Sequence, residues 1–286
     1  MSVIPKSLVR ALYRRLPAGV ATRLGCASWL GRLLYARHPD LRWYQCQYGL
    51  RLQLTGDEAV SNGVAQLGCV HPAETALVIG ALRRYSGIFV DVGTSVDGWH
   101  GLVAASMGHK VVAFEPTARQ HYRFIQNVIA NGLDGLVISR RCALSDHVGE
   151  CRIEDNGPVS MVSASGRGES VRCSTLDAEL ACVDTLPISV LKLDVEGHEI
   201  RVLNGAAQTL KRTSCILMEA CSAYQDRCKA TAPELIERLR SVGFSPYGIS
   251  SAGEIWPWTL EHPSETLNVW FVQNTALKSA DEGVLP

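Results

Sequence analysis

Residues 87–116 read GIFVDVGTSVDGWHGLVAASMGHKVVAFEP, and this stretch gives the strongest indication of the fold class. Its first part, 88–92, is an apolar run rich in β-branched side chains, which predicts a strand buried on both faces of a parallel sheet. Gly93 then turns the chain, and residues 99–107 carry apolar side chains at helical spacing. A second apolar strand ends at Glu115. The stretch therefore predicts a strand, a glycine turn, a helix and a second strand that ends in an acid.

The glycine turn and the acid together predict a site for a nucleoside cofactor. The helix after the turn directs its free N–H groups back at the turn, and Glu115 lies about 20 residues further on, where an acid accepts hydrogen bonds from ribose hydroxyls. The dinucleotide pattern G-x-G-x-x-G is not met, because Ser95 occupies the second glycine position and the next glycine is Gly98. A pyrophosphate needs both glycines, so the pattern favours S-adenosylmethionine over NAD or FAD.

Composition limits the class of protein. The chain has 286 residues, 47% of them hydrophobic, and a formal net charge of zero, which predicts one large domain and gives no indication of nucleic acid as a partner. Its ten cysteines show no CxxC or CxxH spacing and the N-terminus lacks a signal-peptide pattern, so we expect reduced thiols in a cytoplasmic protein without structural zinc. No apolar run reaches the roughly 20 residues of a membrane-spanning helix.

Strand and helix patterns alternate along most of the chain. This alternation predicts a doubly wound, mostly parallel α/β sheet of seven strands, with an inserted hairpin region at 147–187. We expect an N-terminal helical and hairpin extension over 1–70 and the cofactor-binding domain over 71–286. The expected strands are 88–92, 110–114, 136–145, 188–194, 215–219 and 269–272; the expected helices are 73–84, 99–107, 121–131, 200–210 and 233–242; the expected hairpin is 43–54.

The first 39 residues hold seven basic residues and no acid, and Leu8, Leu12 and Leu16 repeat at helical spacing. The favoured interpretation is a docking helix with a solvated basic face. The alternatives are a helix on a membrane surface or against a lipid-linked substrate, a cover for the active site, or a contact between two subunits of a homo-oligomer.

Two strands end in acids, Asp194 and Glu219. Carboxyl ends of neighbouring parallel strands face one crevice, so we expect these side chains to meet near the cofactor. Carboxylates that meet without a cation repel and take up protons, and a divalent metal, a substrate hydroxyl or a sulfonium charge relieves this. Hard oxygen ligands favour magnesium over zinc. Asp194 and Glu219 are therefore candidate catalytic residues and candidate magnesium ligands.

His198 is the candidate general base, because it follows Asp194 closely and an imidazole with a pKa of about 6.5 suits proton transfer at neutral pH. The alternative is a histidine at a helix N-terminus without a catalytic role. Glu196 and Glu199 have a structural alternative as well, since acids at the start of a helix offset its dipole. Trp99 and His100, just after the turn, are candidates for substrate contact.

A family resemblance follows from several segments together. The segments VDVGTSVDGWHGLVAA, VVAFEP and LKLDVEGHEIRVLNGA, with CALSD at 142–146, STLD at 174–177 and ILME at 216–219, resemble the FkbM family of S-adenosylmethionine-dependent methyltransferases. The resemblance covers about residues 70 to 275. It implies a Rossmann-like class I methyltransferase fold and transfer of a methyl group to a hydroxyl of a sugar, glycan or natural product.

The resemblance also implies roles for single residues. Glu115 would hold the ribose. The chain departs from the family pattern DVGxNxG, because Ser95 stands at the Asn position and Asp97 precedes Gly98 as if inserted. Of Asp97 and Gly98, we expect Gly98 to contact the cofactor. Two alternatives stay open: a dinucleotide-dependent oxidoreductase, and a catalytically silent partner subunit with a cofactor fold. The other implied cofactor contacts are Asp91, Gly93, Thr94 and Ser95 at the turn, and Cys142, Ala143 and Leu144 along the adenine.

Overall fold

The structure is a computed structural model that describes residues 41–55, 64, 67–155, 160–163, 165–183, 185–220, 230–250, 254–259 and 267–278. The basic helix expected around Leu8, Leu12 and Leu16 lies outside these residues. Within the described part of the chain, every helix is too short or too polar to cross a bilayer.

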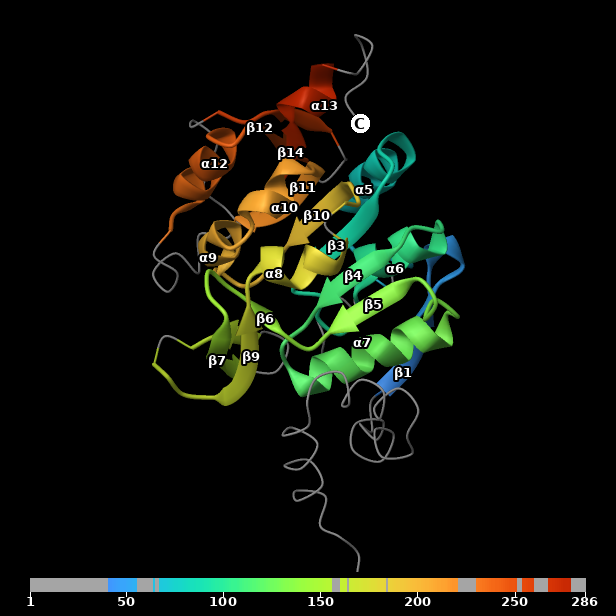
Figure 1. The fold of residues 1–286 in the computed structure, drawn as a ribbon. Coiled ribbons are helices and arrows are strands. Elements are labelled where there is room, and N and C mark those ends of the chain that lie inside the picture. The colour runs from blue at the N-terminus through green and yellow to red at the C-terminus, as the bar shows by residue number, and fades with distance from the viewer. Residues whose placement is uncertain are drawn as a thin grey trace, which may run out of the picture.

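A central sheet of eight strands organises the molecule (Figure 1). Its order is β13-β12-β14-β11-β10-β3-β4-β5, with β14 antiparallel to both β11 and β12. The predicted doubly wound, mostly parallel and Rossmann-like sheet is confirmed, with one strand more than expected. The strands are β3 (Ile88–Val92), β4 (Val111–Phe114), β5 (Val137–Arg140), β10 (Ile188–Leu193), β11 (Thr213–Ala220), β12 (Phe244–Ile249), β13 (Ile255–Pro257) and β14 (Leu267–Gln273).

Helices cover both faces of this sheet because successive strand residues point to opposite sides. In β3, Phe89 packs into one hydrophobic cluster and Val90 into the other, and both are fully buried. One face carries α5 (Pro72–Arg84), α6 (Trp99–Ser106), α7 (Ala118–Ala130) and α13 (Asn274–Lys278); the other carries α8 (Leu176–Leu180), α9 (Glu199–Asn204), α10 (Ala207–Lys211) and α12 (Ala232–Arg240).

The hairpin expected at 43–54 is present as β1 (Leu41–Gln45) and β2 (Arg51–Thr55), joined through η1 (Gln47–Gly49). Its docking on α7 depends on two asparagines. Asn127 accepts a hydrogen bond from the Gln53 N–H at 2.7 Å, and Asn131 exchanges two bonds with the Arg51 backbone, at 2.9 and 2.8 Å. These amides satisfy an edge strand that has no further strand to pair with among the described residues.

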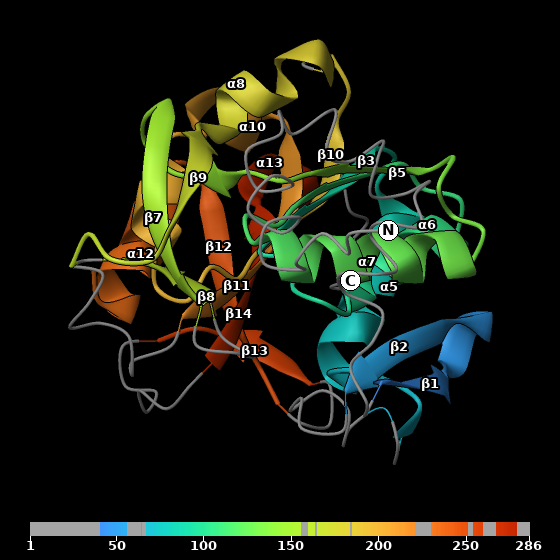
Figure 2. The same ribbon diagram turned by 90° about the horizontal axis from the view of Figure 1, so that it is seen from below.

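A second, four-stranded sheet lies beside the carboxyl ends of the central strands (Figures 1 and 2). We call it the small sheet. The predicted hairpin of the insertion is present as β7 and β8, and β9 and β6 extend it. The single strand expected over 136–145 is therefore wrong: β5 ends at Arg140, and the chain then leaves the central sheet to pair with β9. The small sheet consists of β6 (Ala143–Leu144), β7 (Gly149–Asp155), β8 (Ser160–Val162) and β9 (Glu169–Ser174).

The helix expected over 200–210 is also wrong as a single element. It is divided into α9 and α10 at Gly205, where a Cβ atom would collide with the Ser145 carbonyl. The close contact fixes this helix pair against the chain segment that follows β6.

Candidate functional site

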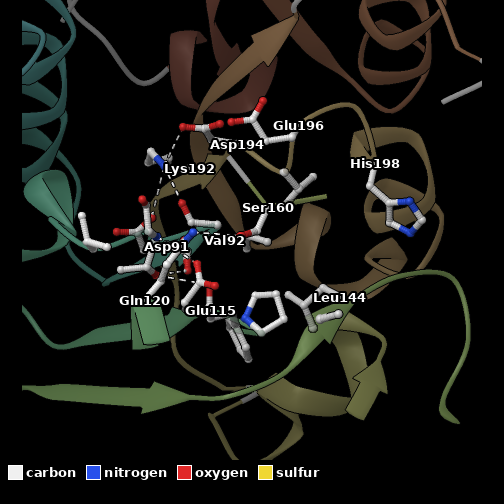
Figure 3. Close-up of a pocket in the computed structure, with 18 of the residues that line it drawn as sticks. Asp91, Val92, Glu115, Gln120, Leu144, Ser160, Lys192, Asp194, Glu196 and His198 are labelled. Atoms are coloured by element: carbon white, nitrogen blue, oxygen red, sulfur yellow. Dashed lines mark hydrogen bonds and ion pairs between the residues drawn. The ribbon is translucent and has the colours of Figure 1, made fainter. Parts of the chain in front are cut away.

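A cavity of about 270 Å³ lies at the carboxyl ends of the central strands and is bounded on one side by the small sheet (Figure 3). Its wall is formed by the turn after β3, the end of β4, residues of β6, β7 and β8, the end of β10 with its following loop, and the segment just before α5. This is the position at which open α/β sheets bind ligands.

The turn after β3 is held in an unusual backbone conformation. Gly93 has φ +79°, and a side chain there would collide with the main-chain carbonyl of Asp194. Ser95 also lies in the left-handed region, at φ +59°, which is uncommon for a residue other than glycine, asparagine or aspartate. Both residues line the cavity, as does Thr94. The turn is therefore fixed by contacts around it.

Glu115 supplies one of those contacts. Its Oε2 accepts the Ser95 N–H at 3.0 Å, and its Oε1 accepts the N–H and hydroxyl of Thr117 at 2.9 and 2.8 Å. The side chain is 3% exposed and lines the cavity. Glu115 thus connects the turn to the start of α7 and faces the space in which a ribose was predicted to bind.

An apolar wall stands at the end of the cavity where adenine was predicted. Cys142, Ala143 and Leu144 line it together with Ile153 and Val162 of the small sheet. Burial raises the pKa of the Cys142 thiol to about 12, so this group stays a neutral thiol at physiological pH. The wall offers an apolar surface of the kind that a purine ring occupies.

Gly98 has a packing role in the structure. It precedes α6 with φ +53°, and a Cβ atom there would overlap the ring of Phe124. The residue is not among those that line the cavity, whereas Asp97 is. Asp97 accepts the Trp99 N–H at 2.9 Å, so the extra residue satisfies a free donor at the start of α6.

Lys192 lies at the centre of the acidic part of the site (Figure 3). Its Nζ is 3.6 Å from Asp91 Oδ1 and 3.1 Å from Asp194 Oδ2, and it donates a hydrogen bond to the Gly93 carbonyl at 3.1 Å. Burial by itself lowers the pKa of Lys192, but Asp194 and Asp91 together raise it above its ordinary value. The ammonium group therefore stays charged and joins the ends of β3 and β10.

Three acids converge beside this lysine. One carboxylate oxygen each from Asp194, Glu196 and Glu219 lies within 4.8 Å of the other two. Burial, with repulsion from Asp194 and Glu196, raises the pKa of Glu219 to about 9. The predicted meeting of Asp194 and Glu219 is thus present, although Glu219 itself does not line the cavity.

Glu199 has a structural role. Its Oε1 accepts the N–H groups of Val195 and Gly197, both at 3.1 Å. Burial raises the pKa of Glu199 to about 7, and these two hydrogen bonds oppose the rise. The side chain therefore holds the loop that presents Asp194 and Glu196.

His198 lines the cavity but lies apart from Asp194 and Glu196 (Figure 3). Its Nε2 is 3.0 Å from Ser145 Oγ, and burial, with the charge of Arg201, lowers the pKa of His198 to about 4. Two left-handed residues precede it, Glu196 at φ +54° and Gly197 at φ +92°, and they turn the loop away from the acids. Closeness in sequence to Asp194 therefore does not place the imidazole beside the carboxylates.

Two further residues of the cavity wall were not predicted. Gln120 of α7 donates a hydrogen bond to Ser160 Oγ of β8 at 2.8 Å, and both residues line the cavity. They connect the central domain to the small sheet across the space predicted for the cofactor. Forty residues separate them in sequence, and neither belongs to a recognisable motif.

Comparison with known proteins identifies the family. Residues 91–246, which include the turn, Glu115 and the acidic loop, match the family model described as the methyltransferase FkbM domain. The chain belongs to the FkbM methyltransferase family.

Individual relatives of this FkbM chain match either over a shorter segment or at low sequence identity. The hexuronic acid methyltransferase AglP of Haloferax volcanii is 29% identical over 134 residues, covering 45% of this chain and 54% of AglP, so the chain spans about half the length of that relative. Among solved structures, the human methyltransferase 10 domain containing protein aligns with 96% of this chain and 98% of its own, at 12% identity and TM-score 0.42. A Pyrococcus furiosus methyltransferase aligns with 80% and 91%, at 11% identity and TM-score 0.42.

This FkbM chain departs from the family pattern at Ser95, and the backbone conformation of that residue shows how the turn is kept. The family pattern DVGxNxG places an asparagine where this chain has Ser95, and asparagine adopts the left-handed conformation more readily than serine. Ser95 adopts it nevertheless, at φ +59°, with its N–H bound to Glu115. The turn conformation is thus kept although the favoured residue type is not.

Proposed function

We propose that this FkbM methyltransferase transfers a methyl group from S-adenosylmethionine to a hydroxyl oxygen of a sugar, glycan or natural product. One observation carries the proposal: the turn after β3 and the acids at the end of β10 face the same cavity and are joined by Lys192. The groups to which we assign the donor and the acceptor thus line one space. The hexuronic acid methyltransferase named above supports a sugar-like acceptor.

The residues present fit S-adenosylmethionine. In the proposed arrangement the apolar wall of Cys142, Ala143 and Leu144 holds the adenine, Glu115 holds the ribose, and the turn at Gly93 holds the amino-acid end. The cofactor supplies an electrophilic methyl on a sulfonium, so the protein has to align the acceptor oxygen and accept its proton.

The acids suit a hydroxyl-rich acceptor. Ionised carboxylates only accept hydrogen bonds, and a sugar offers several O–H donors in a fixed arrangement. Asp194 and Glu196 line the cavity, and Asp194 is already oriented by Lys192. We therefore assign these side chains to alignment of the acceptor. Glu219, predicted as a catalytic residue and magnesium ligand, would act beside Asp194 from the neighbouring strand.

Magnesium is the proposed counter-ion of the acidic cluster. Oxygen ligands from Asp194, Glu196 and Glu219 suit a hard divalent cation, and a cation there would relieve the repulsion that raises the pKa of Glu219. If this part is correct, a chelator reduces turnover and added Mg²⁺ restores it. Turnover that is the same in excess chelator contradicts the magnesium assignment while leaving methyl transfer intact.

Two measurements test the function. Isothermal calorimetry compares S-adenosylhomocysteine with NAD, and we expect binding of the former alone; a preference for NAD would instead support a dehydrogenase. Labelled S-adenosylmethionine is then incubated with a panel of neutral, amino and acidic sugars and glycans. Label that reaches no acceptor, despite cofactor binding, indicates a silent partner subunit.

The variant Asp194→Asn separates alignment from cofactor binding. We expect a fall in turnover of about 10²-fold or more, with affinity for S-adenosylhomocysteine within about twofold of the parent, because the side chain acts on the acceptor. A loss of cofactor affinity that accounts for the whole fall in turnover contradicts the assignment of Asp194 to the acceptor.

A further inference from the structure

We propose that His100 is a further catalytic residue of this site, with its Nδ1 as the atom that accepts the proton of the acceptor hydroxyl. This inference rests on the proposed function. His100 lies in the first turn of α6, directly after the cofactor turn, and lines the cavity together with Trp99. It is 4% exposed, so its environment is set by the protein.

A buried threonine determines the tautomer of His100. The hydroxyl of Thr75 donates its one proton to the Val70 carbonyl at 2.8 Å and accepts the indole N–H of Trp99 at 2.9 Å. The same oxygen lies 3.5 Å from His100 Nε2 and 3.9 Å from the Cys69 thiol, which is a weaker donor. Because Thr75 has no second proton, Nε2 has to be the donor in this contact. A neutral imidazole that carries its proton on Nε2 leaves a lone pair on Nδ1.

The surroundings of His100 keep the ring neutral. Burial lowers the pKa of His100 well below its ordinary value of 6.5, and the positive charge of Lys192 adds to this effect. Lys192 belongs to β10 and His71 precedes α5, while Asp97, in the loop before α6, is the acid nearest in sequence. An unprotonated imidazole at neutral pH is the state that a general base requires.

Two other cavity-lining candidates for a base, Asp194 and His198, are engaged elsewhere. Asp194 is paired with Lys192 at 3.1 Å, and His198 contacts Ser145 at 3.0 Å on the adenine side. His100 contacts Thr75 through Nε2, which leaves the lone pair of Nδ1 for the acceptor, and it lines the cavity together with Asp97.

The proposed step balances as follows. As the acceptor oxygen forms a bond to the methyl carbon, the bond from that carbon to sulfur breaks and its electron pair returns to sulfur, leaving a neutral thioether. The hydroxyl proton passes to Nδ1 of His100, which becomes an imidazolium. The imidazolium later releases this proton to water. The products are the methyl ether, S-adenosylhomocysteine and one proton.

The tautomer is tested without any turnover. In ¹⁵N-labelled full-length protein with S-adenosylhomocysteine bound, long-range ¹H–¹⁵N spectra at pH 7.5 report which imidazole nitrogen carries the proton. The His100→Gln variant assigns the signal, with His100→Asn as a second choice. We expect a neutral ring protonated on Nε2. A ring protonated on Nδ1, or on both nitrogens, overturns the proposal.

Kinetics test the role itself. For His100→Gln we expect kcat to fall about 10²- to 10⁴-fold, the usual contribution of general base catalysis, with affinity for S-adenosylhomocysteine within about twofold. The matched control is His109→Gln, since His109 contacts the Gly87 carbonyl at the opposite end of β3. If the His100→Gln variant keeps the turnover of the parent protein, the proposed role of His100 is wrong, while the proposed function still stands. A parent protein that methylates none of the sugars contradicts the proposed function itself.

Discussion

Single residues determine how firmly the cofactor turn is held, and Glu115 is the clearest case because it binds both the turn and the start of α7. We expect Glu115→Gln to weaken binding of S-adenosylhomocysteine about 10- to 100-fold, since a hydrogen bond to a charged group contributes about 1.5–3 kcal/mol. Calorimetry measures the change, with Glu237→Gln on the surface of α12 (side chain 73% exposed) as the control. Unchanged affinity contradicts the assignment of Glu115 to the ribose.

Two glycines with similar positive φ angles allow the cost of backbone strain to be measured separately from the cost of a side-chain collision. Gly132 has φ +67° and open space around it, so Gly132→Ala should cost only the left-handed strain, about 1–2 kcal/mol. Gly98 has φ +53°, and a methyl group there overlaps the buried ring of Phe124, so Gly98→Ala should cost about 1–3 kcal/mol more. Urea unfolding measures both. Equal losses would show that Phe124 does not restrict position 98.

At this scale the sequence predicted which strand-end residues line the cavity better than it predicted the direction of loop residues. The turn, Glu115 and residues 142–144 all line the cavity, because strand order alone brings strand ends together. The direction of His198 could not be predicted, since it depends on positive φ at Glu196. The contact of His100 with Thr75 was equally hidden, because it joins two helices through one hydroxyl.

Among the elements, α8 ties the two sheets together through Glu179. This carboxylate accepts hydrogen bonds from Arg172 of β9 at 2.6 and 2.9 Å and from Arg140 of β5 at 2.7 Å. Burial by itself raises the pKa of Glu179, but the two arginines lower it to about 2. The folded-state pKa is below the ordinary value, so the stabilisation is present above about pH 4.5 and is lost as the pH falls towards 2.

We therefore expect Glu179→Gln to lower the free energy of unfolding by about 1–3 kcal/mol at pH 7 and to flatten its decline between pH 4.5 and pH 3. Urea unfolding at several pH values measures this, and the exposed Asp134→Asn is the control. A variant with the same steep acid dependence as the parent would show that other carboxyl groups dominate it.

The elements themselves were predictable where the pattern was local. The unit at 88–114 and the hairpin at β1 and β2 appear close to the expected bounds. β12 was missed because Pro246 and Gly248 interrupt its strand pattern, and β6 was joined to β5 because pairing with β9 depends on residues about 30 positions away. Long-range pairing leaves little trace in a single sequence.

For the whole molecule, the cavity wall includes both the central sheet and the small sheet. Cofactor binding should therefore slow hydrogen exchange in β7 and β8 as well as in the turn at 93–98, because a ligand between two sheets stabilises both. Exchange with and without S-adenosylhomocysteine, read by mass spectrometry, measures this. The hairpin of β1 and β2, far from the small sheet in Figure 2, should not change. Protection confined to the turn would exclude the small sheet from the cofactor site.

Gly93 touches the main chain of Asp194 so closely that no side chain fits between them. The turn after β3 and the loop after β10 can consequently change only as a pair, which, under the proposed function, restricts how such an enzyme acquires a new acceptor in evolution. New specificities should arise instead at the exposed rim, at positions such as His71. A mutant library directed at that rim should retain donor binding in far more clones than one directed at the two loops.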